Sequence, residues 1–139
     1  MARSLAGDPD AVFNAPELRM PSWSRDGTRV IGVGPGEGLW QCRLVDQLCD
    51  PLLMNGEPVI GAQPRWSRDG ERIYLRRRTA DDTRHTIWVY DPVPDTLTQT
   101  LEIGPIEANS VTYDIAAGDR IIWARMLDSN SKIWRGRLP

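Results

Sequence analysis

Histidine and cysteine are scarce in this sequence, whose 139 residues include one histidine and two cysteines. A zinc site needs about four nitrogen or sulfur ligands at a regular spacing, which these residues do not provide. The sequence also lacks a Gly-x-Ser-x-Gly motif and a glycine-rich loop leading into a helix, so it predicts neither a serine hydrolase nor a P-loop or Rossmann nucleotide site. We therefore expect no catalytic, metal-binding or cofactor-binding residues and no enzyme activity.

Long hydrophobic runs and an excess of one charge are also missing. No apolar run approaches the roughly 20 residues of a membrane-spanning helix, and the first residues show no stretch typical of a secretion signal. The formal net charge of −2 argues against direct binding of nucleic acid. If the protein is periplasmic, an export signal or membrane anchor must lie upstream of this sequence; otherwise we expect a cytoplasmic location.

The sequence does contain an internal repeat. Residues 21–33 and 64–76 share the pattern Pro-x-Trp-Ser-Arg-Asp-Gly-x-Arg, and the two copies begin 43 residues apart. The Asp-Gly pair predicts a tight hairpin turn, because glycine adopts the left-handed conformation that closes it. β-Branched and aromatic residues then follow, as in a strand. We expect Ser24 and Ser67 to hydrogen-bond to these turns, and a period of this length is typical of one β-sheet blade.

Two further correspondences extend the repeat along the chain. Leu39–Cys42 matches Ile87–Tyr90, and a degenerate third copy begins near Val111, with a turn around Gly118. The tryptophans fall at repeating positions in this scheme, so we expect them to pack between neighbouring sheets. They are Trp23, Trp40, Trp66, Trp88, Trp123 and Trp134.

These matches predict one all-β unit over residues 1–139. The expected parts are a strand around Arg3–Leu5 with a linker in residues 1–20, one blade in 21–56, a second in 64–104 and a partial third in 110–139.

The Pro-x-Trp-Ser-x-Asp-Gly core, followed by a β-rich strand and an Ile-Trp or Leu-Trp strand, resembles the TolB-type WD-like β-propeller repeat. The resemblance covers about Pro21 to Leu138 and implies blades of four antiparallel strands. A propeller closes with roughly four to eight blades, whereas this sequence supplies about three. The ring is therefore incomplete, unless the chain dimerises into a six-bladed ring or forms the C-terminal part of a longer propeller.

Similar repeats occur in periplasmic TolB, in propeller domains of prolyl-oligopeptidase-like enzymes and in sensor regions of membrane-bound winged-helix regulators of the CadC type. Together with the lack of a catalytic motif, the resemblance implies a non-catalytic module for protein–protein interaction or periplasmic sensing. Two alternatives stay open: the C-terminal sensor region of a CadC-type transcriptional regulator, and the propeller domain of a prolyl-oligopeptidase-like enzyme. The expected partner is another protein, and a homodimer is a further option.

One loop of the second blade is longer than its counterpart. Residues 77–86 contain about five more residues than the first blade has there, and loops on a rigid scaffold often vary for recognition. The candidate partner-binding residues at this rim are Arg77, Arg78, Arg84 and Glu37. A basic loop suits an acidic partner; the alternative is a solvated hairpin end that Asp81 and Asp82 partly neutralise. His85 belongs to the same loop and is expected to be exposed.

The two cysteines, Cys42 and Cys49, flank the tip of a hairpin in the first blade. If Val45–Asp46 is a two-residue turn, the cysteines face each other across the strands at a separation that a disulfide can bridge. A four-residue or bulged turn would break this register, and two unrelated thiols are the alternative. A disulfide would imply an oxidising compartment.

Overall fold

The computed structural model describes residues 17–105, 111–127 and 130–135 of the chain. The elements in order are β1 (Arg19–Trp23), β2 (Arg29–Val33), the 3-10 turn η1 (Pro35–Glu37), β3 (Leu39–Arg43), β4 (Cys49–Pro51), β5 (Leu53–Met54), β6 (Glu57–Pro58), β7 (Ala62–Trp66), β8 (Ile73–Arg78), β9 (Arg84–Asp91), β10 (Thr96–Pro105), β11 (Val111–Ala116), the 3-10 turn η2 (Ala117–Asp119), β12 (Arg120–Leu127) and β13 (Asn130–Arg135). The strand expected around Arg3–Leu5, the chain end at Leu138–Pro139 and the side chain of Trp134 lie outside the described residues. Within the described ranges, no helix is long and apolar enough to cross a membrane.

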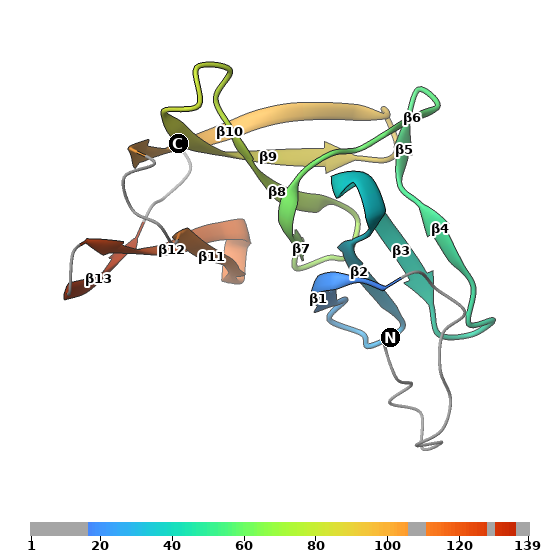
Figure 1. Cartoon of the computed structure of the whole chain (residues 1–139). Coiled ribbons are helices and arrows are strands. Elements are labelled where there is room, and N and C mark those ends of the chain that lie inside the picture. The colour runs from blue at the N-terminus through green and yellow to red at the C-terminus, as the bar shows by residue number, and fades with distance from the viewer. Residues whose placement is uncertain (1–16, 106–110, 128–129, 136–139) are drawn as a thin grey trace.

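Apart from the short β5–β6 ribbon, the described strands form three successive antiparallel sheets, as expected for propeller blades (Figure 1). The first sheet has the order β1-β2-β3-β4, the second β7-β8-β9-β10 and the third β11-β12-β13. Within each sheet, every strand pairs with the next one along the chain, as short connections allow for antiparallel strands. The predicted all-β propeller architecture is therefore confirmed.

The first and second sheets differ at their outer edges. Strand β4 has three residues, whereas its counterpart β10 has ten. Pro51 is the last residue of β4 and has no N–H to extend the ladder. The chain then forms the separate ribbon β5–β6, closed by Asn55 and Gly56 with φ of 51° and 80°. Positive φ at both central residues is typical of a two-residue hairpin turn, so the chain makes an extra hairpin beyond the one that the sequence predicted.

Most of the hydrophobic core lies between neighbouring sheets, and a smaller cluster around Val30 and Cys42 belongs to the first sheet alone. In β8, Ile73 and Leu75 pack toward the first sheet, while Tyr74 packs toward the third. This alternation follows from the period of two along a strand, and each of these side chains is at most 2% exposed. The partners from the first sheet are Ile31, Val33 and Leu39, and those from the third are Tyr113, Ile115 and Ile121. The second sheet is thus buried on both faces.

Trp66 joins the first two sheets at their inner strands. Its indole N–H donates to the backbone oxygen of Ser22 in β1 (3.0 Å), and the Arg29 guanidinium lies over its ring at 4.4 Å. Trp88 packs against the same core, and Trp123 packs against the core between the second and third sheets. The predicted inter-sheet packing is confirmed for these three tryptophans, but it was wrong for Trp23, which packs against Val30 and Cys42 of its own sheet.

A serine and an aspartate close the turn after β1. Ser24 Oγ donates to Asp26 Oδ1 (2.7 Å) and accepts from the N–H of Arg29 (3.0 Å), which confirms the predicted role of this serine. Gly27 has a φ of 71°, in the left-handed region that favours glycine. Hydrogen bonds from Ser24 and from the hydroxyl and N–H of Thr28 lower the pKa of Asp26 to about 2.

The same turn recurs at residues 67–72 and 79–84. Ser67 again donates to an aspartate and accepts from the N–H of the arginine five residues later. In the third case Thr79 takes the place of serine and accepts from the N–H of Arg84 (3.1 Å). Hydrogen bonds from Thr79 and Thr83 lower the pKa of Asp81 to about 2. The loop of the second blade that the sequence marked as longer is thus a third copy of the turn, and Asp81 closes it.

We predict that Trp66→Ala will lower the free energy of unfolding by about 3–5 kcal/mol, because it leaves a cavity between two sheets. Equilibrium unfolding in denaturant measures the loss. Val93→Ala is the control: Val93 is 87% exposed, so its truncation should change stability by less than about 0.5 kcal/mol. A loss below about 1 kcal/mol for Trp66→Ala would show that the ring does not join the sheets.

The aspartate turns should make stability fall in acid. The folded-state pKa of Asp26, about 2, lies below its ordinary value of 3.8. Its hydrogen bonds therefore stabilise the fold above about pH 4 and are lost as the pH falls through about 2. We expect the difference in melting temperature between the native protein and Asp26→Asn to be larger at about pH 6 than at about pH 2. With Glu57→Gln as control, a difference that does not change with pH would contradict this role for Asp26.

Candidate functional site

A groove of about 660 Å³ lies between η1 of the first sheet and strands β7 and β8 of the second. Its lining includes apolar atoms of Met20 and Ile60 and the charged side chains of Glu37 and Arg76–Arg78. The structure thus brings together three of the predicted partner-binding residues, Glu37, Arg77 and Arg78. The fourth does not line the groove: Arg84 Nε lies 3.5 Å from Glu102 Oε1, across β9 and β10.

Arg76 also lines the groove, although the sequence analysis did not select it. Its Nε donates to Gln63 Oε1 (2.9 Å), and its Nη1 lies 2.8 Å from His85 Nδ1. Burial, followed by the nearby charge of Arg78, lowers the pKa of Arg76. Arg76 is therefore held in place by two side chains that have no negative charge.

His85 is buried, with 4% of its surface exposed, so the expectation of an exposed histidine was wrong. Strand β9 begins at Arg84, the last residue of the turn, which places His85 inside a strand. It lies on the same face of β9 as Ile87, which packs toward the third sheet. Burial, together with the charges of Arg76 and Arg78, lowers the pKa of His85 and favours the neutral ring.

Arg77 and Arg78 are held differently. Arg77 Nε donates to the backbone oxygen of Ile60 (2.7 Å), and its guanidinium lies 5.3 Å from the ring centre of Trp88. Arg78 Nη1 forms an ion pair with Asp82 Oδ1 (3.2 Å). For this arginine the alternative from the sequence, a solvated hairpin end that is partly neutralised by Asp82, is therefore correct. Within the described residues, no carboxylate lies within ion-pair distance of Arg77.

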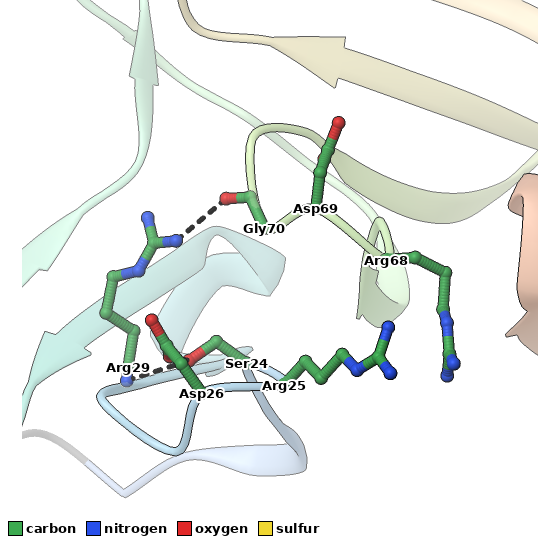
Figure 2. A pocket seen from close by; sticks show the side chains of 7 residues that line it. All are labelled: Ser24, Arg25, Asp26, Arg29, Arg68, Asp69 and Gly70. Carbon is green, nitrogen blue, oxygen red and sulfur yellow. Dashed lines mark hydrogen bonds between the residues drawn. The ribbon is translucent and has the colours of Figure 1, made fainter.

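A second hollow lies on the opposite rim, at the turns that follow β1 and β7. It has a volume of about 370 Å³ and is lined by Ser24, Arg25, Asp26, Arg29, Arg68, Asp69 and Gly70. Figure 2 shows that these residues come from two neighbouring turns and that the Arg25 and Arg68 side chains extend to the same side. The sequence analysis did not select Arg25 or Arg68, although both stand at the same position of the repeat.

Each turn is tied to the turn of the next sheet. Arg29 Nη2 donates to the backbone oxygen of Gly70 (2.7 Å) (Figure 2). At the equivalent position of the second sheet, Arg72 Nη2 lies 2.7 Å from Asp119 Oδ2 in η2. The arginine that ends each turn therefore fixes the spacing between sheets along this rim.

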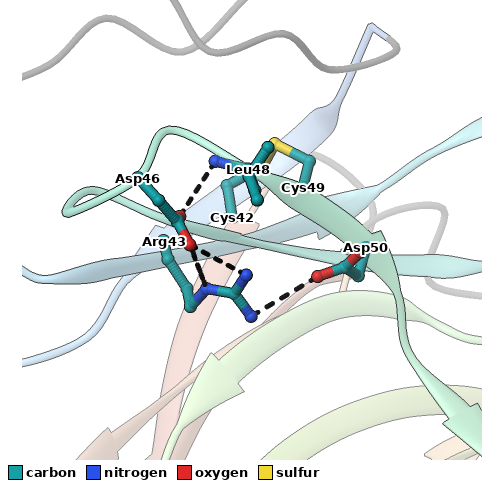
Figure 3. The surroundings of a disulfide bond; sticks show 6 residues. All are labelled: Cys42, Arg43, Asp46, Leu48, Cys49 and Asp50. Carbon is teal, nitrogen blue, oxygen red and sulfur yellow. Dashed lines mark hydrogen bonds and ion pairs between the residues drawn. A yellow bond between two sulfur atoms is a disulfide. The ribbon is translucent and has the colours of Figure 1, made fainter.

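Cys42 and Cys49 face each other across β3 and β4 and form a disulfide, with an S–S distance of 2.04 Å (Figure 3). The N–H of Arg43 donates to the backbone oxygen of Leu48 (2.9 Å), so residues 44–47 form the turn. This turn has four residues, but it is centred on the same point as the two-residue turn considered from the sequence. The cysteine register is consequently the same, and the expectation that a four-residue turn would break it was wrong.

Ser24, Ser67 and His85, which the sequence analysis considered as candidate nucleophiles and base, have structural contacts. The hydroxyls of Ser24 and Ser67 are bonded within their turns, and the buried His85 ring contacts Arg76. Across residues 17–105, 111–127 and 130–135, no group of three or more histidine, cysteine or acidic side chains is placed to hold a metal ion.

Comparisons with known proteins identify the fold. No family model and no curated protein sequence matches this chain. Among solved structures, TolB from Acinetobacter baumannii is similar at 12% identity and a TM-score of 0.65, over 88% of this chain and 30% of TolB. The β-propeller domain of the Trilobed protease from Pyrococcus furiosus, which has an open velcro topology, is similar at 16% identity and a TM-score of 0.56, over 87% of this chain and 38% of that one.

A third similar structure is an acylaminoacyl peptidase from Pyrococcus horikoshii, at 15% identity and a TM-score of 0.54, over 86% of this chain and 25% of the peptidase. The chain thus spans 25–38% of the length of these three proteins. The order of the sheets, the sequence repeat and the similarity to these solved structures all indicate the same fold. The chain has the fold of a TolB-like β-propeller segment.

Proposed function

We propose that this chain is a non-catalytic propeller module that binds a protein partner, and that the groove beside η1 holds an acidic segment of that partner. The observation that supports this best is the state of Arg76 and Arg77. Both guanidinium groups are fixed by groups without negative charge: Gln63 and His85 for Arg76, and the Ile60 backbone oxygen for Arg77. The two guanidinium groups are therefore fixed in position, and their positive charge is available to bind an anion.

The shape and chemistry of the groove favour a peptide rather than a small ion. Met20 and Ile60 provide apolar surface at its edge, with 44% and 42% of their surfaces exposed. Glu37 is paired with Arg19 (2.8 Å), which limits its repulsion of an acidic ligand. A segment that alternates acidic and apolar side chains would place carboxylates on the arginines and apolar groups on these edges.

The disulfide supports a location in an oxidising compartment. Disulfides persist in the periplasm and in secreted proteins, and they are rare in the cytosol. Cys42 and Cys49 form such a bond. A periplasmic module that binds, or senses, a partner in that compartment is consistent with it.

We predict that Arg77→Gln/Arg78→Gln will weaken binding of a fluorescein-labelled peptide of alternating glutamate and leucine by at least about tenfold, because carboxylates lose charged donors. Fluorescence anisotropy measures the affinity, which should also fall as salt is added. A peptide with lysine in place of glutamate should not bind.

Arg84→Gln is the matched control, because it removes one charge from the same hairpin outside the groove. Its affinity for the glutamate peptide should stay within about twofold of the unmodified protein, since exposed ion pairs contribute little. Arg77→Gln alone serves as a second variant, because Arg77 is the groove arginine of this pair that is bound to a backbone oxygen and not to a carboxylate. Equal losses for Arg84→Gln and the groove variants, or no binding at all, would contradict the proposal.

A further inference from the structure

The hollow at the opposite rim has features of a second, separate site. Arg25 and Arg68 occupy the same position of the repeated turn, directly after Ser24 and Ser67. The turn is closed by the serine, the aspartate and the arginine that ends it. The side chain between serine and aspartate has no part in that closure, so it is free to extend outward.

The two turns are held next to each other by direct contacts. Arg29 Nη2 bonds the backbone oxygen of Gly70 (2.7 Å), and the Trp66 indole bonds the backbone oxygen of Ser22 (3.0 Å). Because both turns are also closed by internal hydrogen bonds, their backbones are rigid. The Arg25 and Arg68 side chains therefore extend from two rigid turns that lie next to each other.

Most of the other charged side chains that line this hollow already form hydrogen bonds within the protein. Asp26 accepts from Ser24 and Thr28, and Asp69 accepts from its own turn. Arg29 is bound to a backbone oxygen and lies over a tryptophan ring. Among the described residues, no carboxylate lies within ion-pair distance of the Arg25 or Arg68 guanidinium groups.

The two arginines lie between two adjoining hollows. They line the hollow of about 370 Å³ shown in Figure 2 and also a smaller one of about 210 Å³ beside the first strands. Arg65 lines the smaller hollow as well, where its Nε lies 3.8 Å from Asp114. Figure 2 shows the Asp26 and Asp69 side chains leaving their turns in other directions than the two arginines.

We propose that Arg25 and Arg68 together bind a phosphate group, supplied as inorganic phosphate or as a phosphate monoester. A guanidinium forms paired hydrogen bonds with phosphate oxygens, and two of them match the double charge of a monoester dianion. A single carboxylate matches only one of the arginines. This site is on the other rim from the groove proposed for the acidic peptide and does not depend on it.

The test is a titration of the whole chain with inorganic phosphate and, separately, with phosphoserine at constant ionic strength. The side-chain Nε–H signals of Arg25 and Arg68 report on binding by nuclear magnetic resonance. We expect saturable shifts at both arginines, and an affinity at least about tenfold lower in Arg25→Gln/Arg68→Gln, because charged hydrogen bonds are lost. Sodium acetate at the same ionic strength should give no saturable shift.

Arg78→Gln is the matched control, since it removes one exposed arginine from the opposite rim. It should bind phosphate as the unmodified protein does, while Arg25→Gln/Arg68→Gln should bind the glutamate peptide normally. Saturation by inorganic phosphate alone would assign the site to the free ion, and saturation by both ligands would assign it to monoesters too. Absence of saturation, or an equal loss in Arg78→Gln, would overturn the site without affecting the groove.

Discussion

Most buried apolar side chains of the described residues lie between neighbouring sheets, and the rest of the structure depends on this packing. The second sheet is buried on both sides because Ile73 and Leu75 face one neighbour while Tyr74 faces the other. Because successive side chains of a strand point to opposite faces, three consecutive apolar residues are enough for β8 to contribute to two interfaces. Trp66 fills one of these interfaces, whereas Trp23, at the same position of the first copy, packs against Val30 and Cys42 of its own sheet.

The same packing creates the surfaces available for binding. At one rim, stacking brings Glu37 of the first sheet beside Arg77 of the second; at the other, it places Arg25 beside Arg68. The contacts that fix the sheets, such as Arg29 to the Gly70 backbone oxygen, also fix these charges. Binding residues on opposite rims are thus positioned by one set of inter-sheet contacts.

The sequence predicted the features that repeat and missed those that depend on exact strand ends. Blade order, the inter-sheet position of Trp66 and the serine-closed turn followed from the 43-residue repeat. His85 was misplaced because its hairpin was read as a loose insertion, although Thr-x-Asp-x-x-Arg has the chemistry of the repeated turn. The pairing of Arg25 with Arg68 depends on the spacing between sheets, which a repeat alone does not specify. Dimerisation stays a prediction.

Native-state hydrogen exchange tests most directly whether the sheets stabilise one another. The amides of Val33 in β2 and Leu75 in β8 lie on either side of the first interface. If the sheets form one cooperative unit, both amides should open with free energies that agree within about 0.5 kcal/mol. An opening of the first sheet that leaves Leu75 protected by several kcal/mol more would show that the sheets are stable independently, and it would contradict this account.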